Sequence, residues 1–247
     1  RKMHEHAIAI LPDSCDDKLV MDPMGRLTFF LRDYDSHLFQ ILESDNWFSS
    51  NGHPSGGIMG GTIGVSDMDA AFKFYCNILG YDKVVYDKKG TFKDWEHLPG
   101  GEECYRRVLL SQTSPGTGGF SSMMGPTYIE LVYALDRKGE FIFKDRIWAD
   151  TGIVHLGFDV RGMQELGEEL KKDGFGFRCD TDDALSMGDH TSVHCTYIDD
   201  PDECWIEMIE VHKIPILEKF GLFLDVQKRE PSKPLPKWML YALKFNR

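Results

Sequence analysis

Residues 58–80, IMGGTIGVSDMDAAFKFYCNILG, combine a short strand pattern with a helix pattern that ends at a glycine. Ser66 is the expected N-cap, and Gly80 stands where a residue with positive φ ends a helix. The apolar residues that recur at helical spacing form one stripe: Met68, Ala71, Phe72, Tyr75 and Leu79. The stretch therefore predicts a strand followed by an amphipathic helix.

A second stretch, residues 153–174, repeats this order as IVHLGFDVRGMQELGEELKKDG. Its helix carries the stripe Met163, Leu166 and Leu170, and it ends at Gly174. Further strand-like segments follow each helix, and the last one in each copy has a glutamate embedded in it: TYIELVYAL at 127–135 and CWIEMIEV at 204–211. A Gly/Ser/Pro-rich loop at 111–126 makes the first copy longer. We interpret 58–211 as two copies of strand–helix–three strands.

The expected fold class is α+β, with βαβββ modules at 56–136 and 150–212. Residues 1–45 are interpreted as the back half of another module, without its front strand and helix. In this interpretation the stretch FFLRDYDSHLFQILE at 29–43 is a final hairpin, and Gln40 falls where Glu130 and Glu207 fall. Residues 213–247 are expected to be a helical tail, with one amphipathic helix over 216–228, a Pro-rich link and a second short helix.

The amino-acid composition disfavours several classes of protein and of binding partner. The chain is 42% hydrophobic and carries a net charge of −12, with a pI of about 5.2. It is too apolar for a disordered protein. Its acidity disfavours nucleic acid and anionic membranes as partners, and no apolar run is long enough for a membrane span. The six cysteines form no CxxC pair, so we expect free thiols and a cytoplasmic location.

Strand alternation places three ionisable side chains away from the helix-covered face. His155 alternates with the apolar Val154 and Leu156, while Glu130 shares a face with Tyr128 and Glu207 shares one with Trp205. A charge in the middle of an apolar strand is costly unless it is paired or bound to a metal. We therefore predict that Glu130, His155 and Glu207 bind one divalent ion, chosen from Zn, Ni, Fe and Mn.

Each of these residues also has a plain structural interpretation. A strand histidine is more often a hydrogen-bonded core or rim residue, and a strand glutamate is more often solvated. Tyr128, Trp205 and His194 are expected to contact a substrate, and His190 and His194 are otherwise bystanders near loops. Several aspartates look like turn and cap residues: Asp67, Asp199, Asp200 and Asp202.

At these residues the sequence resembles the vicinal-oxygen-chelate superfamily, which includes glyoxalase I, methylmalonyl-CoA epimerase, extradiol dioxygenases and fosfomycin or bleomycin resistance proteins. The segments that carry the resemblance are TIGVSDMDAAFKFYCNILGYDKV, YIELV, IVHLGFDV and DDPDECWIEM. They cover 58–211 well, and 26–43 more weakly. The resemblance implies a U-shaped mixed sheet with helices outside, closed around a metal ion. It implies four ligand positions, of which the last three fall on Glu130, His155 and Glu207, and the first on Gly60, which cannot ligate.

The implied activity is that of a glyoxalase-like metal-dependent lyase, isomerase or epimerase, acting on a small substrate chelated through adjacent oxygens. Glu130 or Glu207 would then be the general base. One alternative is a metal-free protein that binds a drug or antibiotic. The other is an extradiol ring-cleaving dioxygenase, which Gly60 disfavours because such enzymes usually have a second histidine there. The expected partners are a small-molecule substrate and, as a candidate, a second copy of the chain.

Overall fold

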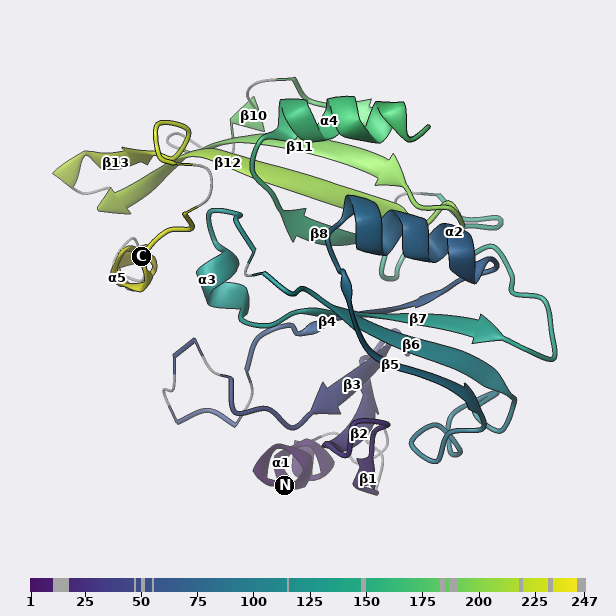
Figure 1. The fold of residues 1–247 in the computed structure, drawn as a ribbon. Helices are drawn as coiled ribbons and strands as arrows, with labels where there is room; N and C mark the ends of the chain where they lie inside the picture. The colour runs from purple at the N-terminus through teal and green to yellow at the C-terminus, as the bar shows by residue number, and fades with distance from the viewer. Residues whose placement is uncertain are drawn as a thin grey trace.

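Three β-sheets organise the residues that the computed structural model describes (Figure 1). The described residues are 1–10, 18–46, 48–49, 52–54, 56–114, 116–147, 150–182, 185–186, 191–217, 220–230 and 233–243. The strands and helices of these ranges form an α+β fold with mixed sheets.

The first complete module has the predicted order of strand, helix and three strands. Its strands pair in the order β4-β7-β6-β5, with β4 parallel to β7 and the other pairs antiparallel. A short helix, α3 (Ser121–Met124), lies in the loop before the last strand. The remaining elements are β4 (Gly60–Gly64), α2 (Met68–Phe72) continued by a π-helix (Lys73–Ile78), β5 (Lys83–Gly90), β6 (Tyr105–Ser111) and β7 (Tyr128–Ala134).

The second module repeats the arrangement, because its first strand β8 again runs parallel to its last strand β12. The middle strand β11 pairs antiparallel with β12. Its elements are β8 (His155–Asp159), α4 (Met163–Lys172), β9 (Cys179–Asp180), β10 (Leu185–Ser186), β11 (Ser192–Asp199) and β12 (Trp205–Leu217).

The strand registers of the two modules are equivalent. Glu130 lies opposite Thr62 in the β4–β7 pair, as Glu207 lies opposite Gly157 in the β8–β12 pair. Two residues earlier, Gly60 lies opposite Tyr128 as His155 lies opposite Trp205. Gly60 therefore occupies the position in the first module that His155 occupies in the second.

The helix ends agree with those predicted from the sequence, with one correction. Gly80 and Gly174 have φ of 74° and 89°, as predicted for residues that end a helix. The N-cap of α2 is Asp67 instead of Ser66, since the Asp67 carboxylate accepts from the backbone N–H groups of Asp69 and Ala70.

The first helix continues as a π-helix, and its buried stripe differs from the predicted one. Leu79 N–H donates to the Phe74 carbonyl five residues earlier, and this wider turn rotates the residues that follow it. Phe74 is fully buried, whereas the predicted stripe residues Phe72 and Leu79 are only partly buried.

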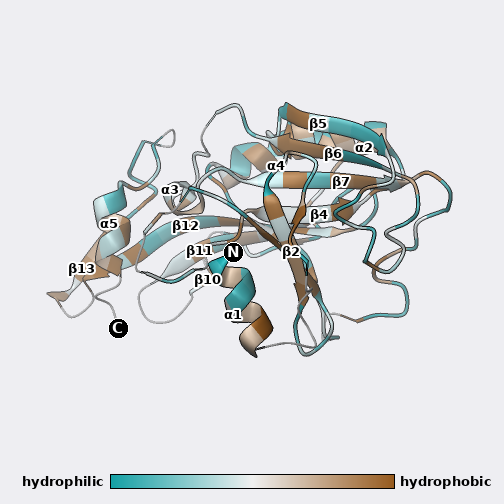
Figure 2. Ribbon diagram, turned by 90° about the horizontal axis from the view of Figure 1, so that it is seen from below, coloured by the Kyte–Doolittle hydropathy of each residue, from teal (hydrophilic) through white to brown (hydrophobic). Residues whose placement is uncertain are grey.

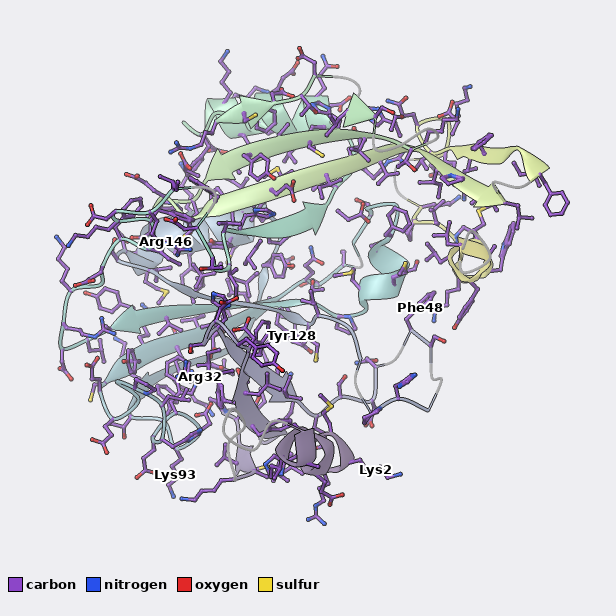
Figure 3. The ribbon with its side chains drawn as sticks, turned by 180° about the vertical axis from the view of Figure 1, so that it is seen from behind. Lys2, Arg32, Phe48, Lys93, Tyr128 and Arg146 are labelled. Carbon is purple, nitrogen blue, oxygen red and sulfur yellow. The ribbon has the colours of Figure 1, made fainter. Side chains whose placement is uncertain are left out.

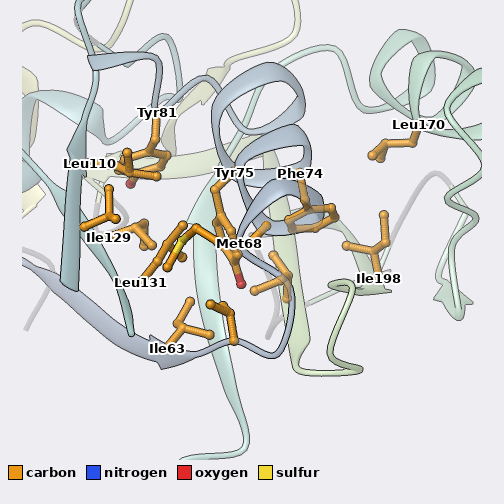
Figure 4. Close-up of a cluster of buried hydrophobic side chains, with 14 of the residues drawn as sticks. Ile63, Met68, Phe74, Tyr75, Tyr81, Leu110, Ile129, Leu131, Leu170 and Ile198 are labelled. Atoms are coloured by element: carbon orange, nitrogen blue, oxygen red, sulfur yellow. The ribbon is translucent and has the colours of Figure 1, made fainter. Parts of the chain in front are cut away.

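One hydrophobic core joins the two modules. Figure 4 shows Phe74 and Tyr75 between Ile63, Ile129 and Leu131 of the first module and Ile198 and Leu170 of the second. The Tyr75 hydroxyl donates to the buried Asp200 carboxylate at 2.6 Å, which links the first module's helix to the turn before β12. The modules therefore share their interior and do not pack as separate bodies.

The N-terminal sheet is preceded by a helix, and the interpretation of residues 1–45 as the back half of a further module stays a prediction. Helix α1 (Lys2–Ile10) leads into the antiparallel strands β1 (Val20–Met21), β2 (Leu27–Arg32) and β3 (Leu38–Leu42). The helix has polar and apolar residues (Figure 2). Ala7 is buried, and the His4 ring lies against Phe29 of β2. The pattern at 1–10 is too short to stand out by periodicity alone.

The described residues of 216–228 do not form the helix expected there. Strand β12 continues to Leu217 and pairs with β13 (Leu222–Asp225). Among the described residues of the C-terminal tail, the helical element is α5 (Lys237–Ala242). The strand persists because Val211 and Ile214 pack with Leu235 and Leu240 in a second small core. Burial in that core overrides the local helical pattern.

Two features of composition are visible in the structure. Within the described ranges, five cysteines are free thiols, as predicted, and Cys15 lies outside those ranges. None of the described helices has the length and apolar character needed to cross a membrane.

Gly60 gives a direct test of the β4–β7 register. With φ of 154°, a Cβ at this position would lie 1.7 Å from the Tyr128 carbonyl oxygen. We expect Gly60→Ala to lower the free energy of unfolding by about 1–3 kcal/mol. The control is Gly64→Ala in the same strand, where an added Cβ meets open space, with an expected change within about 1 kcal/mol. Urea denaturation of both variants measures the difference, and equal effects would contradict the register.

Candidate active site in the cleft between the sheets

A cleft of about 1940 Å³ opens between the N-terminal strands and the two modules. Its walls include Gln40 of β3, Tyr128 and Glu130 of β7, and His155 of β8. Figure 3 shows Tyr128 near the centre of the molecule, beside the N-terminal strands. The strand alternation predicted for these residues is confirmed in β8, where Leu156 and Phe158 pack into the core and His155 lies in the cleft wall.

Glu130 is buried, with 5% of its surface exposed, and both carboxylate oxygens are already engaged. Its Oε1 accepts from Arg107 Nε at 2.7 Å and from the Tyr86 hydroxyl. Its Oε2 accepts from Thr62 Oγ1 at 3.2 Å. The charge that the sequence left without a partner is thus neutralised by an arginine.

Arg107 is held from every side. It is 1% exposed, and one guanidinium nitrogen donates to both oxygens of Asp94 at 2.9 Å. Its Cζ atom lies 3.8 Å from the ring centroid of Trp95 and 4.6 Å from that of Phe92. Two carboxylates and two aromatic faces fix this guanidinium in one position.

Sequence reasoning missed Arg107, although a signal was present. The residue sits in YRRVLLS, a strand in which Arg107 alternates with the apolar Val108 and shares a face with Leu109. A buried arginine in a strand calls for a carboxylate partner for the same reason that a buried glutamate calls for a cation.

The second module presents a smaller network. His155 Nε2 lies 3.1 Å from Glu207 Oε2, and the Tyr197 hydroxyl donates to Glu207 Oε1 at 2.5 Å. The exposed fraction is 25% for the His155 side chain and 17% for that of Glu207. Burial, followed by the hydrogen bond to Glu207, raises the pKa of Tyr197, so this hydroxyl stays a proton donor near neutral pH.

These groups do not assemble the four-ligand site that the resemblance implies. Gly60 has no room for a side chain, and Glu130 is saturated by Arg107, Tyr86 and Thr62. Within the described part of the chain, one group brings three His, Cys, Asp or Glu ligand atoms within 4.8 Å of one another, and it contains none of the three predicted ligands. The structure brings His155 to Glu207 and leaves Glu130 apart, so the residues here do not fit a shared metal ion.

The predicted substrate contacts lie in two different places. Tyr128 and Trp205 both line the cleft. The Arg26 guanidinium lies over the Tyr128 ring, and Trp205 stacks on Phe143 at 4.3 Å between centroids. His194 pairs across the strands with Glu210 and therefore lies on the opposite face of the sheet from Glu207. His190 lies outside the described residues.

Asp159 ties the long loop of the first module to the second module. Its Oδ2 accepts from Phe120 N–H at 2.5 Å, directly before α3. Burial raises the pKa of Asp159 to about 6, although the backbone N–H groups of Phe120 and Gly119 oppose the shift. Because Asp159 also lines the cleft, its protonation state is coupled to the packing of that loop.

Removing the Arg107 cation should destabilise the protein. Arg107→Met leaves Glu130 and Asp94 as buried charges without their common partner, and we expect a loss of about 3–5 kcal/mol in the free energy of unfolding. The matched control is Arg106→Met, which breaks the exposed pair with Asp87 at an expected cost of about 0–1 kcal/mol. Chemical denaturation of both variants gives the comparison, and similar losses would contradict the assigned role.

The raised pKa of Asp159 predicts a pH dependence of stability. The folded state holds this proton up to about pH 6, above the usual value of 3.8 for an aspartate, so between these values it binds more protons than the unfolded state. The wild-type protein should therefore lose stability relative to Asp159→Asn as pH rises from about 4 to about 6, with no further relative change above. Parallel stability curves for the two proteins from pH 4 to 8 would refute the assignment.

Comparison with known proteins agrees with the fold and the order of the motifs. Residues 58–208 match the family described as the Glyoxalase/Bleomycin resistance protein/Dioxygenase superfamily. No match was found among the curated proteins.

Similar solved structures include a glyoxalase I variant from Zea mays, 16% identical, with a TM-score of 0.50 over 83% of this chain and 63% of that one. A trypanothione-dependent glyoxalase I from Leishmania major is 21% identical, with a TM-score of 0.39 over 63% of this chain and 87% of that one. A glyoxalase family protein from Bacillus cereus is 14% identical, with a TM-score of 0.46 over 66% of this chain and 99% of that one. The tandem modules, their equivalent registers and the match over 58–208 show that this chain belongs to the glyoxalase/bleomycin resistance/dioxygenase superfamily.

Proposed function

We propose that this chain binds a small organic molecule in the cleft, and that it does so without a metal ion at the ligand positions of the superfamily. The observation that carries the proposal is the ion pair between Glu130 and Arg107. A divalent ion at Glu130 would have to displace a guanidinium that is also bonded to Asp94 and stacked on Trp95. Breaking a buried pair of this kind costs about 3–5 kcal/mol.

The cleft walls indicate the chemistry of the ligand. Tyr128 and Trp205 present aromatic surface from equivalent ends of β7 and β12, and Phe39 of β3 is 42% exposed on the N-terminal side. His155 is one of the polar groups of the same wall that can form a hydrogen bond with a ligand. Aromatic surface in a cleft is typical of sites for small molecules, and these residues favour a ligand with a planar aromatic part.

A metal-dependent lyase, isomerase or epimerase is the second candidate. It is favoured by the contact between His155 and Glu207, whose ligand atoms lie 3.1 Å apart. Two protein ligands fall short of the three that catalytic zinc sites use. A ring-cleaving dioxygenase is less well supported, because Gly60 stands at the position of its second histidine.

The test is a ligand screen on protein that has been treated with a chelator. We expect members of a panel of aromatic acids and amides to raise the melting temperature without added metal. Tyr128→Ala should weaken the best of them by about tenfold or more in calorimetric titration, since the aromatic contact is lost. Tyr34→Ala is the matched control, because Tyr34 is 97% exposed on the surface.

Two results would contradict the proposal. One is ligand binding that appears only after Zn²⁺ or Ni²⁺ is added and disappears in His155→Ala. The other is metal-dependent turnover of a thiohemiacetal substrate by the wild-type protein, lost in the same variant. The first would establish a metal-dependent binding site at His155, and the second would establish the metal-dependent enzyme.

A further inference from the structure

We propose that His194, Glu210 and His212 bind a divalent transition-metal ion of the Zn²⁺ class, at a site outside the cleft. One ligand atom from each residue lies within 4.8 Å of the others. His194 of β11 lies directly opposite Glu210 of β12, and His212 follows two residues further along β12. The proposal is independent of the ligand that the cleft binds.

The site lies on the face of the sheet that packs against helix α4. Thr196 shares this face with His194, and its hydroxyl donates to the Met163 sulfur in the first turn of that helix. Glu207 and Tyr197 form a pair on the other face. The sheet itself therefore separates this group from the cleft.

Neighbouring groups hold two of the three side chains in position. Glu210 Oε1 accepts from Gly162 N–H at 2.7 Å, while Glu210 Oε2 lies 3.4 Å from His212 Nε2. The His194 ring is held by Asp180, whose Oδ1 lies 2.6 Å from Nε2. Backbone and carboxylate contacts of this kind orient ligands around protein-bound metals.

Burial and charge favour a bound cation. His194 is 9% exposed and His212 is 6% exposed, so both imidazoles have left bulk water. Asp180 and Glu210 bring two negative charges, and the Arg161 guanidinium, whose Nε lies 3.8 Å from Glu210, brings a positive one. That guanidinium also donates to the carbonyls of Val226 and Arg229. Two imidazoles and a carboxylate are ligands that suit Zn²⁺, and a divalent ion would offset the remaining negative charge.

A metal here would be structural. The ligands come from two neighbouring strands, and Glu210 also bonds the backbone at the start of α4. An ion bound by all three would join β11, β12 and the first turn of that helix. Binding of an ion to the folded state alone stabilises that state.

The experiment uses the full chain, treated with EDTA, dialysed and titrated with Zn²⁺, and in parallel with Co²⁺ as a spectroscopic probe. We expect about one equivalent of tightly bound metal, a rise in melting temperature, and a visible Co²⁺ absorption band of a tetrahedral site. Glu210→Gln and His212→Asn should each lose the tightly bound metal ion and the Co²⁺ absorption band. Asp180→Asn should weaken binding by about 10–100-fold, because it removes only the group that orients His194.

Two controls make the result decisive. Glu210→Gln keeps an oxygen for the Gly162 N–H, so circular dichroism should show that this variant folds. His155→Asn changes the cleft alone and should bind metal as the wild type does. The proposal is overturned if folded wild-type protein takes up no metal at micromolar Zn²⁺, if both ligand variants retain it, or if His155→Asn loses it. The ligand screen of the cleft has a separate readout, so the two proposals fail independently.

Discussion

The ion pairs of Arg107 set the character of the cleft. One guanidinium satisfies Glu130 of the neighbouring strand and Asp94 of the loop after β5, and it is covered by Trp95 and Phe92. In the wall of the first module, the charges of Arg107, Glu130 and Asp94 therefore satisfy one another. These three side chains offer a ligand few free hydrogen-bonding atoms. Tyr128 and Trp205 also line the cleft and offer aromatic surface for recognition.

The two modules share a backbone plan and differ in what they place on it. The registers at Glu130 and Glu207 are equivalent, yet the first glutamate is paired with an arginine and the second with a histidine and a tyrosine. Equivalent positions in a duplicated fold thus carry different chemistry. Function follows from the side chains at those positions and not from the architecture.

The sequence predicted the modules well because their signals are local. The helical stripe through Met163 and Leu170, the helix-ending Gly80 and Gly174, and the alternation around His155 all come from neighbours in the chain, and the structure contains each of them. The 216–228 segment was wrongly predicted as a helix because its conformation depends on strand pairing and on a small core that includes Val193 of β11, which is distant in sequence.

The interaction partners of the site residues could not be predicted from local sequence patterns. No residue near Glu130 in the chain indicates that Arg107 is its partner. Strand pairing places Leu109 directly opposite Glu130, and Arg107 reaches the carboxylate from two residues earlier in the strand. The grouping of His194 with His212 likewise depends on the β11–β12 register. Metal sites, ion pairs and hydrogen bonds across a sheet join residues that are far apart in the chain. A sequence therefore predicts that a buried charged residue needs a partner more readily than it predicts which residue the partner is.

The backbone at Gly60 also limits how this cleft can change over evolutionary time. A ligand at that position would require a side chain where the Tyr128 carbonyl now stands, so no single substitution supplies one without moving the β4–β7 pair. Variants that build a four-ligand centre would therefore pass through a less stable intermediate, whereas variants that alter the aromatic walls would not. The ligand of this cleft can therefore change by substitution more readily than the cleft can acquire a four-ligand metal centre.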